Sequence, residues 1–144
     1  MSNSLSSFSD FAVLIMRLSI GIIYMLVFGL RKLTGGVELW KKLGTAMSKF
    51  GINFMPEVWG FMAMFSEFFV PILMILGFLY RPSLCLITFT MVMASITHLS
   101  KMDPWGDVAF PLIMMFVFIS MLIMGPGKFS IDFYLKKKKK TNEA

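Results

Sequence analysis

The chain has 144 residues, of which 57% are hydrophobic and 15% are charged, and its formal net charge is +6. A soluble domain of this size needs far more polar surface to cover its core, so the composition excludes an ordinary soluble domain and predicts one integral membrane domain. Half of the fourteen lysines and arginines lie at Arg81, Lys128 and 136–140. They suit anionic lipid headgroups better than nucleic acid.

Cysteine and histidine are scarce, with one residue of each type, Cys85 and His98. One cysteine excludes an intramolecular disulfide and a CxxC site, and one histidine argues against bis-histidine haem. The fifteen methionines could suggest copper(I), but methionine is also a common apolar filler of helices. The sequence therefore predicts no metal site and no covalently bound cofactor.

The first apolar segment covers residues 11–30, which is about the length of a membrane-spanning helix. The ten residues before it lack the basic region and cleavage site of a signal peptide, so we expect this helix to remain in the mature chain. One face of the segment carries residues at helical spacing that should point into the bundle, namely Arg17, Gly21, Tyr24 and Phe28.

Residues 34–56 predict an amphipathic helix between the first two spans. Its apolar residues fall on one side and its basic residues on the other; the apolar set is Trp40, Leu43, Met47 and Phe50. Such a helix can lie in the membrane interface, or it can pack as a flap over the mouth of the bundle. The pattern leaves both placements open.

Three further apolar segments, at residues 58–79, 83–99 and 108–124, complete an all-α, four-helix transmembrane bundle. We expect residues 1–135 to form this single domain and residues 136–144 to form a basic, solvated tail. Four spans place both termini on one side of the membrane. The basic residues are nearly balanced between the two sides, so the positive-inside rule barely distinguishes the two orientations.

Glu67 lies in the middle of the second predicted span. An uncompensated charge at membrane depth costs about 2.5–3.5 kcal/mol on insertion scales, so such residues usually face a polar cavity or a partner. Pro71 follows four residues later and cannot donate to the Glu67 carbonyl, which should leave a free backbone acceptor beside the acidic side chain.

Helical rise places Arg17, Glu67, His98 and Asp107 at successive depths across the bundle. Arg17 should reach Glu67 and bind its carboxylate. Two interpretations remain open: Glu67 and His98 handle protons beside a small molecule bound by Arg17 and Asp107, or Arg17 and Glu67 form a structural pair. Trp59 and Phe68 could flank a bound ring.

Several short motifs in order along the chain resemble the DoxX-like family of small membrane proteins. They are Arg17-Leu18-x-x-Gly21, Gly29-x-x-Lys32-Leu33, Glu67 followed by Gly77 to Pro82, His98, and Gly125 to Asp132. The resemblance implies a four-helix bundle with cytoplasmic termini in a bacterial cytoplasmic membrane, and a link to redox chemistry. Its pattern selects Arg17, Lys32, Glu67, Arg81, His98 and Asp132. We predict that Arg81 and Asp132 form an ion pair at the termini side.

The leading functional hypothesis is a protein of redox or quinone-stress chemistry that binds a quinone-like molecule in a polar cavity within the membrane. It would be at most a membrane subunit of an oxidoreductase, because electrons would have to come from a partner protein. The alternative is a non-enzymatic carrier or an assembly factor for another membrane protein. The sequence does not specify the oligomeric state.

Overall fold

The computed structural model describes residues 2–142, with the backbone alone for residues 2–7, and all regular elements in this part of the chain are helical. The elements in chain order are α1 (Ser2–Tyr24), the π-helical turn η1 (Met25–Gly29), α2 (Leu30–Thr34), α3 (Gly36–Gly44), the 3-10 helix η2 (Thr45–Phe50), α4 (Pro56–Leu76), α5 (Tyr80–Ser100), α6 (Trp105–Met124) and α7 (Ile131–Asn142). The all-α prediction is confirmed.

Four helical segments in the described chain are long and apolar enough to cross a membrane: Phe8–Thr34, Pro56–Leu76, Tyr80–Ser100 and Trp105–Met124. The first of them combines most of α1 with η1 and α2. The turn between the second and third spans lies three residues earlier than predicted, at residues 77–79, because α4 ends at Leu76 and Gly77 adopts a left-handed conformation with φ of 65°. Glycine adopts this conformation without steric cost, and the N–H of Phe78 then bonds the Leu73 carbonyl to close the helix end.

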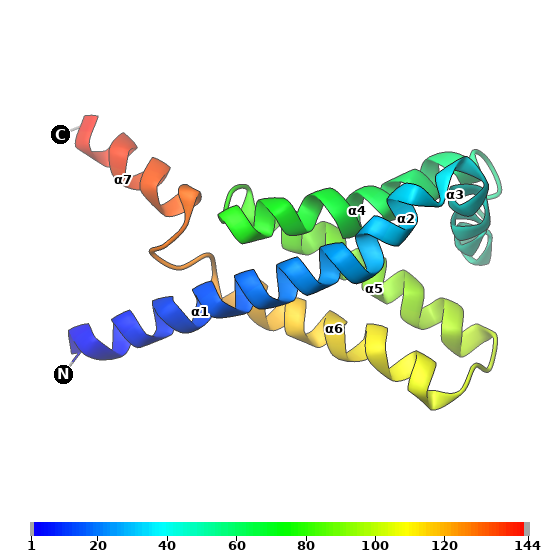
Figure 1. The fold of residues 1–144 in the computed structure, drawn as a ribbon, viewed down its shortest axis with the longest axis horizontal. Helices are drawn as coiled ribbons and strands as arrows, with labels where there is room; N and C mark the ends of the chain where they lie inside the picture. Colours follow the sequence, from blue (N-terminus) through cyan, green and yellow to red (C-terminus); the bar gives the residue numbers. More distant parts are fainter. Residues whose placement is uncertain (1, 143–144) are drawn as a thin grey trace.

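Figure 1 shows α1 crossing beside α4, with α5 and α6 running together on the other side and both termini at one end of the bundle. The core between these helices consists of fully buried apolar side chains, among them Tyr24, Met74, Leu84, Ile87 and Phe118. The outward faces remain apolar, as Ile23, Phe116 and Ile123 illustrate. An apolar exterior around a packed core is what a lipid environment requires.

The segment between α2 and α4 packs against the bundle at the end opposite the termini (Figure 1). α3 approaches the start of α4 so closely that the Trp40 backbone lies against Gly60, and the Trp40 indole N–H donates to the Lys32 carbonyl at 2.8 Å. Lys49 in η2 donates to the Thr97 carbonyl near the end of α5 at 3.2 Å. The predicted amphipathic helix thus exists, and it also covers part of the bundle end.

The predicted boundary between the membrane domain and the solvated tail, at residue 135, lies inside a continuous helix. This helix, α7, spans Ile131–Asn142. The lysines at 136–140 are exposed on this helix. Lysine has a high helix propensity, which allows a basic run to stay helical once the first turn is held in place.

Candidate functional site

A cavity of about 400 Å³ lies in the half of the bundle away from the termini, and all four spans contribute to its wall. Its lining contains Tyr24, Phe28, Arg31, Lys32, Glu67, Met91, Ala94, His98, Gly106, Asp107, Phe110 and Pro111. The structure therefore brings together three of the predicted site residues, Glu67, His98 and Asp107. It also places Lys32, which the family resemblance selects, and Tyr24, which the helical spacing puts on the inward face of the first span, in the same wall.

Glu67 forms an ion pair with Lys32 at the wall of this cavity. The distance from Lys32 Nζ to Glu67 Oε1 is 2.5 Å, and the side chains are 21% and 2% exposed, respectively. The second carboxylate oxygen, Oε2, is buried and has no hydrogen-bond partner among the described residues. The prediction that Arg17 binds the Glu67 carboxylate is therefore wrong. The cation that compensates Glu67 is Lys32.

The register between α1 and α4 explains this correction. Gly21 lies against Ile75, and Gly29 lies against the backbone of Glu67 and Phe68. Arg17 precedes Gly29 by twelve residues, about 18 Å along the helix, which is beyond the reach of its side chain. Antiparallel spans at 11–30 and 58–79 would place residue 11 level with residue 79. The observed contacts instead place Gly21 level with Ile75 and Gly29 level with Glu67, so the start of the first span extends past the end of α4.

Gly29 is the contact that allows this register. A Cβ atom at this position would collide with the Glu67 carbonyl, so only glycine permits the approach. Pro71 leaves that carbonyl without its helical N–H donor, as predicted, and α4 continues through the proline to Leu76. Gly29 closes the π-helical turn, and single π turns of this kind are frequent at functional sites.

Aromatic rings form another part of the wall. The ring centroids of Phe28 and Phe110 are 4.7 Å apart in a stacked arrangement, and the Tyr24 and Phe28 centroids are 5.1 Å apart. The Tyr24 hydroxyl donates to Met91 Sδ at 3.1 Å. These rings line the same cavity as the Lys32–Glu67 pair, so its wall combines apolar and charged groups.

The mouth of the cavity carries a second acid–base pair. His98 Nδ1 lies 2.8 Å from Asp103 Oδ2, and both side chains are partly exposed. Asp107, at the start of α6, is also exposed. Asp103 escaped sequence reasoning because it follows the end of α5, where helical periodicity no longer relates it to His98. Such a carboxylate orients the imidazole by selecting which ring nitrogen carries the proton.

Comparison with known proteins identifies the family of this chain. The family model for DoxX matches residues 12–99. The chain belongs to the DoxX family. Neither the curated proteins nor the solved structures give a significant match. The matched region of this DoxX protein contains Lys32, Glu67 and His98, whereas Asp103 and Asp107 lie just beyond it.

Two predicted ring-binding residues do not line the DoxX cavity. The Trp59 indole N–H donates to the Phe54 carbonyl at 3.1 Å near the start of α4, and Phe68 packs edge-on against Phe69. Both lie on faces of α4 other than the one that carries Glu67. Within residues 2–142, no group of three or more His, Cys, Asp or Glu side chains is placed to hold a metal ion.

Arg17 instead joins three segments at the termini end of the DoxX bundle. Arg17 is 1% exposed, and its guanidinium donates to four backbone carbonyls, those of Met74, Ile75, Pro126 and Phe129, at 2.6–2.9 Å. The carbonyls of Met74 and Ile75 belong to the last turn of α4, where the usual N–H donors four residues later are missing, although Met74 also accepts from the Gly77 N–H at 3.1 Å. Arg17 is therefore a structural clamp between α1, the end of α4 and the loop after α6.

Asp132 belongs to the same end of the molecule, but Arg81 is not its partner. The Asp132 carboxylate accepts hydrogen bonds from the backbone N–H groups of Leu79 and Tyr80 at 3.0 and 2.9 Å, and the Asp132 N–H donates to the Gly77 carbonyl at 3.0 Å. Arg81 is exposed and forms no ion pair with Asp132 in the described structure. The unpaired N–H groups at the start of α5 attract the carboxylate, so this predicted ion pair is wrong.

We expect Asp132→Ala to lower the free energy of unfolding by about 1–2 kcal/mol, because the start of α5 loses a carboxylate cap. Arg81→Gln should change it by less than about 0.5 kcal/mol, as an exposed side chain. Denaturant titration of the purified protein in detergent measures both. If the exchange Asp132→Arg with Arg81→Asp restored the stability lost in either reversal alone, an ion pair would be present and the capping assignment would fail.

Proposed function

We propose that this DoxX protein binds the head group of a quinone, or of a chemically similar small molecule, in the Glu67 cavity, and that it serves as a membrane subunit or accessory of an oxidoreductase. The observation that carries the proposal is the Lys32–Glu67 pair, whose second carboxylate oxygen has no partner in the described structure. Intramembrane ionisable pairs at a cavity wall commonly mark ligand or proton pathways.

The chemistry of a quinone fits these two side chains. A quinone carbonyl oxygen accepts hydrogen bonds, and the Lys32 ammonium can donate one to it and stabilise negative charge that develops there on reduction. Reduction to the quinol consumes two electrons and two protons. Electrons come from a redox partner protein in this proposal, and Glu67 can pass protons through its available oxygen.

The shape of the cavity also supports a flat ring. Its volume of about 400 Å³ falls within the range of about 300–1,000 Å³ that is usual for small-molecule sites. Phe28 and Phe110, whose rings stack on one another, give the wall an aromatic part in addition to the charged pair. At the mouth, His98 is held by Asp103 and can exchange protons with the aqueous phase.

The test is binding of a short-chain benzoquinone to the purified protein, with wild type and Glu67→Gln compared at matched abundance. We expect Glu67→Gln to weaken binding at least about tenfold, because a charged hydrogen-bonding group is lost, which is worth about 1.5–3 kcal/mol. Glu57→Gln is the control, since Glu57 is a carboxylate on the same helix with a 42% exposed side chain. It should change affinity less than twofold.

Three results would count against the proposal: no benzoquinone binding by the wild type, equal affinity in Glu67→Gln, or equal losses in the two variants. The cellular counterpart is resistance to quinones or oxidants, which Glu67→Gln should reduce at normal abundance. A protein that copurifies with one other membrane polypeptide and with no small molecule would instead favour the alternative of a carrier or assembly factor.

For the location, we infer a bacterial cytoplasmic membrane with both termini on the cytoplasmic side. The termini side carries seven basic residues, at Arg81, Lys128 and 136–140, and the opposite side carries six by sequence. Lys32 is one of those six, and its ammonium pairs inside the bundle with Glu67, so five remain to act as loop charges. This supports the orientation under the positive-inside rule.

Reporter fusions test the orientation. A reporter active only in the cytoplasm should be active after residue 144 and inactive when inserted at residues 45–50, in η2. A periplasmic reporter should give the reverse pattern at the same two sites. Activity of the cytoplasmic reporter in η2 would invert the assignment.

A further inference from the structure

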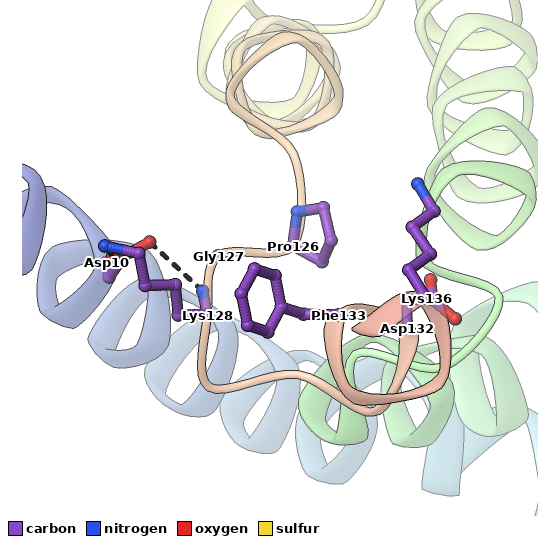
Figure 2. A pocket seen from close by; sticks show the side chains of 7 residues that line it. All are labelled: Asp10, Pro126, Gly127, Lys128, Asp132, Phe133 and Lys136. Atoms are coloured by element: carbon purple, nitrogen blue, oxygen red, sulfur yellow. Dashed lines mark hydrogen bonds and ion pairs between the residues drawn. The ribbon is translucent and has the colours of Figure 1, made fainter. Parts of the chain in front are cut away.

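A surface hollow of about 300 Å³ lies at the termini end of the molecule, far from the Glu67 cavity. Figure 2 shows its walls: Asp10 on α1, the loop of Pro126 to Lys128, and the first turns of α7 with Phe133 and Lys136. It is open to the outside and combines an aromatic ring with basic side chains at the level where the first span begins. This is the depth at which lipid headgroups meet the ends of membrane helices.

The acidic groups of this hollow are already engaged within the protein. Lys128 Nζ lies 2.9 Å from Asp10 Oδ2, and the Lys128 N–H donates to Asp10 Oδ1 at 3.1 Å. The Asp132 carboxylate caps α5 through the N–H groups of Leu79 and Tyr80. The exposed lysines of α7, among them Lys136, Lys138 and Lys140, therefore give this end of the molecule its positive charge.

α7 is held at a defined position rather than hanging from the bundle. Asp132 ties its first turn to the α4–α5 connection, and Ser130 Oγ accepts the Phe133 N–H at 3.2 Å as a helix cap. From this attachment α7 extends past the end of α4 (Figure 1). The direction of the lysine run is thus set by the fold of the membrane domain.

Apolar and basic residues are separated along the axis of α7. Its start and the preceding loop expose large apolar side chains: Phe129 is 58% exposed, Phe133 41% and Tyr134 67%. At about 1.5 Å per residue, the lysines at 136–140 follow Phe133 by about 5–10 Å. The polar layer of a bilayer is about 5–8 Å thick on each side, so aromatic residues at its inner boundary place the lysines among the phosphates.

We propose that α7 and this hollow form a binding surface for anionic phospholipids of the surrounding leaflet. The lipid phosphate lies against Lys136 and the following lysines, and the upper acyl chain packs on Phe133 and Phe129. Lysine ammoniums act as point charges, so they recognise negative charge and do not distinguish one anionic headgroup from another. This surface is independent of the function proposed for the Glu67 cavity.

The test compares the lipids retained by the full-length protein after purification from vesicles of phosphatidylcholine and phosphatidylglycerol in equal amounts, measured by native mass spectrometry. In the tail variant, Lys136, Lys138 and Lys140 are changed to glutamine. In the control, Lys41, Lys42 and Lys101 are changed to glutamine, which removes the same charge from exposed positions at the opposite end.

We expect the wild type to retain phosphatidylglycerol in excess, and the tail variant to lower the ratio of phosphatidylglycerol to phosphatidylcholine at least threefold. The control should keep the wild-type ratio. Salt at 0.5 M should also reduce the enrichment, because the contact is electrostatic and exposed. A wild type without enrichment, an equal loss in the control, or a tail variant that keeps the wild-type ratio would overturn the proposal.

Discussion

Replacing Arg17 by leucine should lower the free energy of unfolding by about 4 kcal/mol or more. The guanidinium serves four carbonyl oxygens from two separate segments, and each buried acceptor left without a donor costs about 1–3 kcal/mol. Unfolding in detergent with increasing denaturant measures the loss, and abundance in the membrane should fall with it.

Two variants control for the loss of charge and for the change to leucine. Arg17→Lys should recover only part of the stability, because an ammonium has three donors and cannot span carbonyls on both segments. Arg31→Leu changes an exposed arginine at the other end of the same span and should alter stability by less than about 0.5 kcal/mol. An Arg17→Leu protein as stable as the wild type would show that the clamp does not hold this end together.

Replacing Lys32 alone should lower the free energy of unfolding more than replacing Lys32 and Glu67 together. Lys32→Met leaves a carboxylate that is 2% exposed without its cation, and breaking a buried pair in this way costs about 3–5 kcal/mol. The double variant, Lys32→Met with Glu67→Gln, should return to within about 1 kcal/mol of wild type. A double-mutant cycle in detergent should give a coupling energy of about 2–3 kcal/mol.

The exposed pair of Lys41 and Glu57 provides the matched cycle. Its atoms are 3.7 Å apart and its side chains are 58% and 42% exposed, so Lys41→Met and Glu57→Gln should couple by less than about 0.5 kcal/mol. Equal coupling energies in the two cycles would mean that water reaches Glu67 freely and that its burial has no energetic consequence. Benzoquinone binding should also be measured in the double variant Lys32→Met with Glu67→Gln. If this variant is as stable as wild type but no longer binds benzoquinone, the pair has a role in binding that is separate from its role in stability.

The two ends of the bundle thus have different roles. At the termini end, Arg17 and Asp132 each bind backbone groups from neighbouring segments and hold the helices together. At the opposite end the charged residues pair with one another around a cavity. A closed end can align the helices while the other end leaves space for a ligand, which is a common arrangement for sites between the helices of a bundle.

Composition and periodicity were sufficient for the fold. Apolar runs of about twenty residues separated by Gly, Pro and charged residues predict membrane helices whatever their neighbours are, because a buried backbone in lipid must form its hydrogen bonds within the helix. Errors were confined to the helix ends. The turn at Gly77 to Leu79 lies three residues earlier than expected, and α7 continues past residue 135 because a capped first turn holds it.

The sequence by itself also determined that Glu67 needs a cation and a polar surrounding, since a carboxylate in an apolar span requires compensation wherever it lies. Which cation it meets was decided by tertiary structure alone. The close contact of Gly29 with the Glu67 backbone sets the register of α1 on α4, and a register of this kind depends on side-chain shape at the crossing point. That contact places Lys32 on Glu67 and leaves Arg17 about 18 Å away to bind carbonyls.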